Sequence, residues 1–170
     1  MGISASKRVQ RALNSSHEFN SACNSVYAEF LSLAQHAFAG VKPYQLFSAT
    51  VHLHRTLSHS LPLISKWVPR CPDRVHVDRA LKTVLSRRSE AAPPEEITLG
   101  ESEFKEFALE VFRDAVVSNA GREVLKKVPL GVAGIAGVGV VVKPGKEVVA
   151  AAIGAYALAV ATSIYLSLDV

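Results

Sequence analysis

The stretch that decides the fold of this chain reads VPLGVAGIAGVGVVV (residues 128–142), KPGKE (143–147) and VVAAAIGAYALAVATSIYLSL (148–168). Lys143, Lys146 and Glu147 carry the only charges in these 41 residues. The second apolar run has 21 residues, which at ~1.5 Å per residue covers the ~30 Å hydrocarbon core of a bilayer. The first run has 15 residues and reaches only about 22 Å. Together they predict a helical hairpin in or through a membrane.

The composition of this stretch indicates how strongly it favours insertion. Eight Val, Ile and Leu residues within 148–168 contribute about 2–5 kcal/mol in total at a helix centre. Several Thr, Ser and Gly residues lower that sum, so a partner helix would assist. Small residues three or four apart let helices pack closely in lipid. We expect such contacts at Gly131, Gly134, Gly137, Ala151, Gly154, Ala155 and Ala159.

Two other readings of the apolar stretch stay open. A water-soluble bundle could bury its last two helices completely, because tightly packed core helices are also rich in Ala, Val and Gly. Alternatively, only the second run spans the membrane, as a single C-terminal anchor.

The N-terminal hexapeptide Met1-Gly2-Ile3-Ser4-Ala5-Ser6 matches the N-myristoylation signal, which predicts that Gly2 is acylated. One myristoyl chain binds membranes only weakly, with K of about 10⁴ M⁻¹, so a second signal is needed. We expect that signal from the hairpin and from contacts of basic side chains with anionic lipid. These side chains belong to Lys7, Arg8 and Arg11. A chance match and an organelle transit peptide are the alternatives, whereas no apolar run suggests a secretory signal.

Charge is distributed unevenly along the chain. Residues 1–90 hold 12 Lys and Arg against 5 Asp and Glu, a net of +7, whereas residues 91–127 hold 5 against 8, a net of −3. This split suggests a basic body that faces anionic lipid or an acidic partner, together with a separate acidic helix. The two cysteines, Cys23 and Cys71, lack the spacing of a disulfide framework or zinc site.

Periodicity and capping signals predict an all-α fold: a small amphipathic bundle followed by the hydrophobic hairpin. Capping boxes at Ser15 and Thr98 and a cap at Asp73 mark three helix starts, the first for a helix that continues to Phe38. The predicted segments are a myristoylated basic N-terminus (1–14), a basic helical domain (15–88), a Pro-containing linker (89–100), an acidic amphipathic helix with a basic lead-in (101–127) and the membrane hairpin (128–170).

No catalytic or metal-binding set emerges from the sequence. His52 and His54 point about 200° apart on a helix and lack a third ligand. Cys71 and His76 lack an orienting third group, and Cys23 lies in an apolar stripe, typical of a packed core thiol. We therefore expect no cofactor and no enzymatic activity, and the scattered basic residues do not suggest nucleic-acid binding.

These observations lead to the hypothesis of a non-catalytic, membrane-tethered adaptor or scaffold. Its N-terminus would be cytosolic, and its partners would be membrane lipids and a protein, or a second copy, that meets the hairpin. The alternative is a bilayer-active component such as a pore subunit or a curvature inducer. The sequence offers only Thr162, Ser163 and Ser167 to line a pore.

Overall fold

The computed structural model describes residues 2–35, 37–88, 97–142 and 146–169, and these are helical with short connections. The predicted all-α class is confirmed. The described parts contain no strand, only one antiparallel bridge between Val41 and Leu99. The elements are α1 (Gly2–Ser15), α2 (His17–Leu33), the 3₁₀ turn η1 (Pro43–Gln45), α3 (Leu46–Ser60), α4 (Pro62–Trp67), α5 (Arg74–Ser86), α6 (Glu101–Val142), α7 (Lys146–Leu166) and the 3₁₀ turn η3 (Ser167–Asp169).

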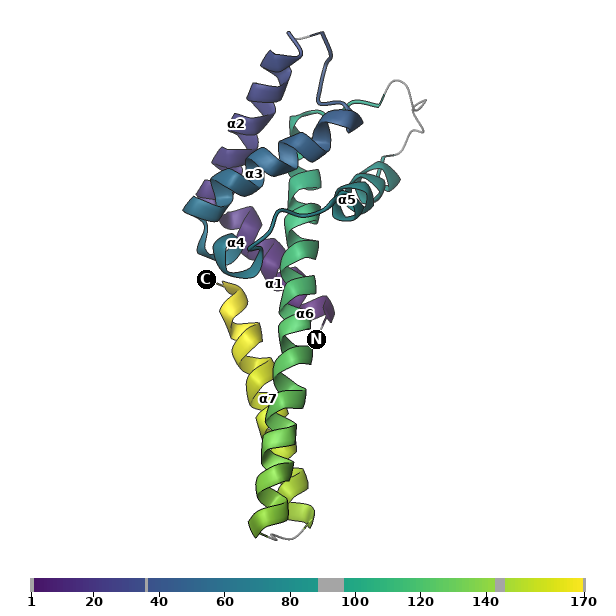
Figure 1. Cartoon of the computed structure of the whole chain (residues 1–170). Coiled ribbons are helices and arrows are strands. Elements are labelled where there is room, and N and C mark those ends of the chain that lie inside the picture. The colour runs from purple at the N-terminus through teal and green to yellow at the C-terminus, as the bar shows by residue number, and fades with distance from the viewer. Residues whose placement is uncertain (1, 36, 89–96, 143–145, 170) are drawn as a thin grey trace.

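The longest helix, α6, is the axis of the molecule. Helices α1 to α5 gather around its first half, and α7 runs antiparallel beside its second half (Figure 1). Its 42 residues correspond to about 63 Å of helix. We expected the acidic helix with its basic lead-in to end at Lys127 and the hairpin to begin at Val128, but α6 continues through Gly121 and Pro129. An interior proline removes one backbone donor and crowds the preceding turn, yet the helix is unbroken across it.

The bundle core forms on the predicted apolar stripe of the first half of α6. Phe104, Phe107 and Phe112 are fully buried there. Phe19 of α2 meets Phe112 edge to face, with ring centroids 6.4 Å apart. Burial of each such ring stabilises the fold by about 1.5–3 kcal/mol, so this aromatic layer binds α2 to the axis.

Helix ends differ from the sequence expectations in detail. The cap of α2 is Ser16, not Ser15, because α1 extends to Ser15 and the Ser16 hydroxyl accepts the backbone N–H of Phe19 at 3.1 Å. This helix ends at Leu33, not near Phe38, since Gln35 adopts a positive φ of 50°.

The other two predicted helix starts gave opposite outcomes. The Asp73 cap is confirmed, because its carboxylate accepts the backbone N–H of His76 at 3.1 Å. Thr98 does not cap α6: its carbonyl accepts from Arg88, and the Glu103 carboxylate instead accepts the backbone N–H of Gly100 at 3.2 Å.

The acidic helix has its basic partner within the same chain. Arg79 of α5 pairs with Asp114 of α6 at 2.8 Å, and Arg87 pairs with Glu110 at 2.8 Å. Arg88 pairs with Glu103 and, through these hydrogen bonds, holds the pKa of that carboxyl below its usual value. The basic and acidic segments predicted from the sequence therefore neutralise each other in part where α5 packs on α6.

Gly40 permits a close backbone crossing in the bundle. A Cβ at this position would lie 2.3 Å from the carbonyl oxygen of Leu99, whose strand-like segment exchanges two 2.9 Å hydrogen bonds with Val41. We predict that Gly40→Ala lowers the free energy of unfolding by about 1–3 kcal/mol, because the backbone must shift. Thermal unfolding of the full chain in mild detergent measures this effect.

Gly121→Ala is the matched control, because a Cβ at Gly121 has no atom within 4 Å. In the exposed middle of α6 it should raise stability by up to ~1 kcal/mol, since alanine is the better helix former. Equal changes in both variants would contradict the role assigned to Gly40.

Candidate membrane hairpin and basic groove

Helix α7 presents an apolar surface that the rest of the chain does not cover. Residues Glu147–Leu166 have a mean hydropathy of 1.9, and only 6% of the apolar window is buried. This is the one helix in the described parts that is long and apolar enough to cross a membrane. Only at its end do Ile164 and the following Leu168 join the bundle core. The fully buried hairpin considered from the sequence does not match this arrangement.

The two arms of the hairpin meet at a glycine. The Tyr156 hydroxyl of α7 donates to the carbonyl oxygen of Lys127 on α6 at 3.2 Å. A Cβ at Gly131 would lie 2.0 Å from the Tyr156 ring, so the missing side chain is what makes room for the tyrosine. The contact fixes the register of the antiparallel helices, with the middle of α7 beside the Lys127–Gly131 turn of α6.

The other predicted small residues do not hold the hairpin together. Added Cβ atoms at Gly134, Gly137 and Gly154 would meet nothing within 4 Å. Ala151, Ala155 and Ala159 are likewise exposed, four residues apart on α7. Of the seven expected packing positions, only Gly131 packs inside the chain, and the remaining six face outward.

The register defines an uncharged belt that both arms share. On α6 the belt comprises residues 128–142, and the part of α7 beside it extends from Val148 to about Tyr156. Its length is about 22 Å, shorter than the ~30 Å hydrocarbon core. Lys126 and Lys127 lie directly above it, with side chains 70% and 57% exposed. Long lysine side chains can snorkel and so accommodate such a mismatch.

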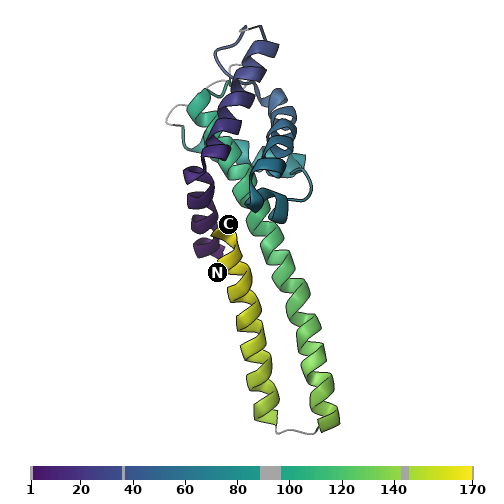
Figure 2. The same cartoon turned by 90° about the vertical axis from the view of Figure 1, so that its left-hand side faces the viewer.

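The N-terminal helix lies at the same end of the bundle. Ala5, Val9 and Leu13 are buried where α1 packs on α6 and η3. The N-terminal end of α1 and the C-terminal end of the chain both lie where α7 meets the bundle (Figure 2). The acylation site expected at Gly2 is thus on the hairpin side.

The predicted basic trio on α1 does not form a single surface. Lys7 and Arg11 are exposed. Arg8 is half-buried, and its guanidinium lies 4.6 Å from the centre of the Tyr165 ring of α7. Arg8 therefore connects α1 to the hairpin, whereas Lys7 and Arg11 remain available to solvent or lipid.

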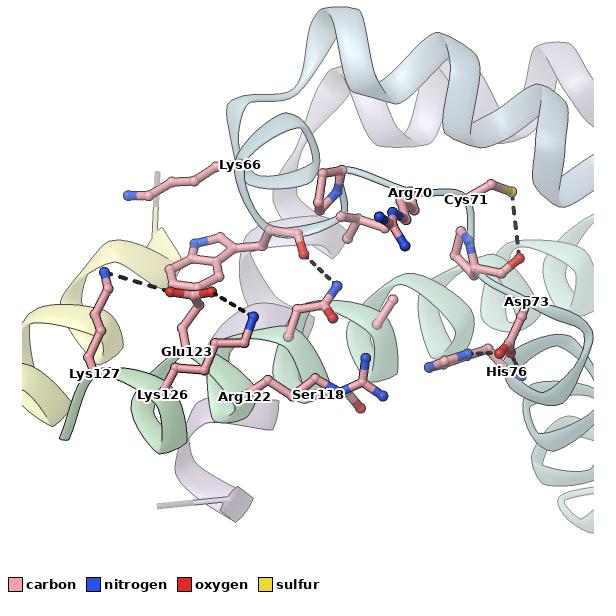
Figure 3. Close-up of a pocket in the computed structure, with 16 residues that line it drawn as sticks. Lys66, Arg70, Cys71, Asp73, His76, Ser118, Arg122, Glu123, Lys126 and Lys127 are labelled. Atoms are coloured by element: carbon pink, nitrogen blue, oxygen red, sulfur yellow. Dashed lines mark hydrogen bonds and ion pairs between the residues drawn. The ribbon is translucent and has the colours of Figure 1, made fainter. Parts of the chain in front are cut away.

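A groove of about 740 Å³ runs along α6 just before the hairpin begins, between this helix and the segment from α4 to the start of α5 (Figure 3). We call it the basic groove. Its lining has five cations and two carboxylates: Lys66, Arg70, Arg122, Lys126, Lys127, Asp73 and Glu123. The groove could not be predicted from the sequence, because one wall comes from α4 and the connection after it, and the other from α6, some fifty residues later. Its only sequence signal was the group of basic residues Arg122, Lys126 and Lys127.

Trp67 forms the back of the basic groove and ties it to the hairpin. Its indole N–H donates to the carbonyl oxygen of Ser167 at 3.3 Å, and its own carbonyl accepts from Asn119 of α6 at 2.8 Å. The ring is 6% exposed. Through these bonds α4, α6 and η3 meet at one residue.

Burial and a neighbouring carboxylate set the surroundings of the two cysteines and of His76. Burial raises the pKa of Cys23 to about 12, so this thiol stays protonated as a core side chain. Burial also raises the pKa of Cys71, whose thiol lies 3.6 Å from the Pro72 carbonyl. His76 contacts the Asp73 carboxylate at 2.7 Å. Among the described residues no group of three or more His, Cys, Asp or Glu side chains is placed to hold a metal ion.

Comparisons with protein-family models, curated proteins and solved structures found no match for this chain. The candidate function therefore rests on the geometry of the chain itself.

The Gly131–Tyr156 contact gives a test of the hairpin register. We predict that Gly131→Ala lowers the melting temperature in detergent by several degrees, because it displaces the Tyr156 ring and removes its hydrogen bond to Lys127. Gly134→Ala, on the open face, should leave the melting temperature unchanged or slightly raised.

A double-mutant cycle separates this contact from a general glycine effect. In a Tyr156→Ala background the cost of Gly131→Ala should vanish. A cost that persists without the tyrosine ring would contradict the assigned register.

Proposed function

We propose that this protein is a non-catalytic adaptor or scaffold tethered to the cytosolic face of a membrane by its C-terminal hairpin. The exposed apolar surface of α7 carries this proposal. A soluble protein rarely leaves an apolar surface of this length uncovered, and each Å² left in water forgoes about 25 cal/mol. Contact with the acyl chains of a bilayer would remove this cost.

Three features on one end of the bundle support the tether. The hairpin leaves the bundle there, and the N-terminal end of α1 lies beside it. The basic groove brings Lys126 and Lys127 of α6 to the start of the hairpin. If Gly2 is acylated, its chain would enter the same leaflet that the hairpin enters. The N-terminus is then cytosolic, and a fully inserted hairpin returns the C-terminal end to the same side.

The outward-facing small residues support association with another membrane helix. Ala151, Ala155 and Ala159 form a stripe that no part of the described chain covers. Such a stripe permits close approach of a second helix in lipid, where packing replaces the hydrophobic effect as the driving force. A scaffold role needs both a fixed anchor and a surface for partners, and the hairpin offers the two together.

Ala151→Arg tests insertion directly. Ala151 is exposed and lies near the middle of the uncharged belt, so the substitution leaves the bundle core intact. An arginine near the centre of a membrane helix costs ~2.5–3.5 kcal/mol on the insertion scale, comparable to the whole favourable sum of the second apolar run. We predict that most of the variant is released by alkaline carbonate, whereas the wild-type protein stays in the membrane pellet.

Val75→Arg is the matched control, because Val75 is 60% exposed on α5, away from the hairpin. It should remain in the pellet like the wild type. Release of the wild-type protein itself by carbonate would refute the tether.

The acyl anchor has its own measurement. We predict that the intact mass of the protein from eukaryotic cells corresponds to loss of Met1 and gain of a myristoyl group, and that Gly2→Ala lacks the adduct. Because the hairpin contributes most of the binding, Gly2→Ala should reduce membrane residence only in part. Full release by this substitution alone would contradict the dominance of the hairpin.

A further inference from the structure

We infer that the basic groove binds the headgroup of an anionic phospholipid that carries a phosphomonoester at its outer end, such as a phosphorylated inositol lipid. The inference rests on the proposed insertion of the hairpin and adds a ligand class to it. It follows from the position of the groove, the state of its cations and the placement of its lysines relative to its arginines.

Position along α6 sets the height of the cations above the lipid. Arg122 lies six residues before the uncharged belt begins at Val128, which is about 9 Å along the helix. The headgroup layer on each side of a bilayer is only ~5–8 Å thick. Where the bilayer thins locally so that its hydrocarbon core matches the belt, Arg122 therefore lies at the outer edge of that layer. A phosphate on the far end of an extended headgroup reaches this height, whereas the phosphodiester next to glycerol does not.

The lysines and the arginines of the basic groove differ in whether they form an ion pair. Lys126 and Lys127 already share Glu123, with N···O distances of 3.7 and 3.8 Å. Neither Arg70 nor Arg122 has an ion-pair partner in the described parts of the chain. The two arginines come from opposite walls, Arg70 from the connection after α4 and Arg122 from α6. Guanidinium groups suit phosphate because they donate paired hydrogen bonds.

The lysines of the groove lie nearer the hairpin than the arginines do. Figure 3 shows Lys66 and Lys127 at the hairpin end of the groove, with Arg70 and Arg122 farther from it. A headgroup that enters between the two lysines keeps its glycerol and acyl chains beside the uncharged belt. A soluble anion gains nothing from that alignment, so a lipid is the ligand that uses the whole groove. The cations at the mouth also raise the local concentration of anionic lipid.

Trp67 reports on occupation of the groove, because it is the only tryptophan of the chain and lines this site. The full-length protein is first inserted into phosphatidylcholine nanodiscs. Short-chain phosphatidylinositol 4-phosphate is then titrated while Trp67 fluorescence is recorded. We expect a saturable change, and a clearly weaker response to short-chain phosphatidylserine, whose charge stays close to the glycerol.

Arg70→Gln combined with Arg122→Gln should weaken binding about 25-fold, because each cation near an anionic headgroup contributes about fivefold. The matched control, Arg55→Gln with Lys82→Gln, removes the same charge from positions that do not line the groove. It should bind like the wild type. Equal losses in the two double variants, no loss in the groove variant, or equal responses to both lipids would overturn the inference.

A separate arm identifies the source of the phosphate. Inositol 1,4-bisphosphate presents the same phosphate chemistry without acyl chains, and we expect it to bind at least tenfold more weakly than the lipid. Equal affinity would make the ligand a soluble phosphate ester and overturn the lipid assignment. Failure of the wild-type protein to enter nanodiscs would refute the proposed tether, whereas an inserted protein without a lipid response refutes only this inference.

Discussion

The continuity of α6 is the constraint on which the rest of the structure depends. The same helix supplies the buried Phe104, Phe107 and Phe112 of the bundle and one arm of the exposed hairpin. Because no loop separates the two halves, the bundle cannot rotate freely about its anchor. The orientation of α1, α4 and the basic groove relative to a membrane is consequently a property of the fold. A flexible tether would provide attachment without this orientation.

Charged residues are paired differently along the two halves of α6. On the upper half of α6, Glu103, Glu110 and Asp114 pair with arginines of α5 and of the two positions after it, so their charges are largely satisfied within the bundle. Near the hairpin, Arg70 and Arg122 have no ion-pair partner in the described parts. These two guanidinium groups line the basic groove next to the uncharged belt, which is where anionic lipid would neutralise them.

Sequence patterns predicted the type of the secondary-structure elements better than their boundaries or their contacts. The all-α class, the aromatic stripe on α6 and the Asp73 cap follow from local spacing. The uninterrupted passage through Gly121 and Pro129 does not, because packing against α7 and α4 outweighs the local helix propensity. Six of the seven small residues face away from the intramolecular partner, which depends on helix rotation. The basic groove joins Arg70 with Arg122, and no local pattern reveals a contact over that separation.

The central claim is that lipid surrounds the hairpin, and spin-label accessibility at Ala151, near the middle of the uncharged belt, tests it most directly. A nitroxide is attached to Ala151→Cys in a background without the two native cysteines, and the protein is placed in phosphatidylcholine vesicles. Our account predicts frequent collisions with oxygen, which concentrates in hydrocarbon, and few with a water-soluble nickel complex. A label at Val75→Cys should show the reverse. If the nickel complex reaches position 151 as readily as position 75, the apolar arm lies in water and the membrane tether is wrong.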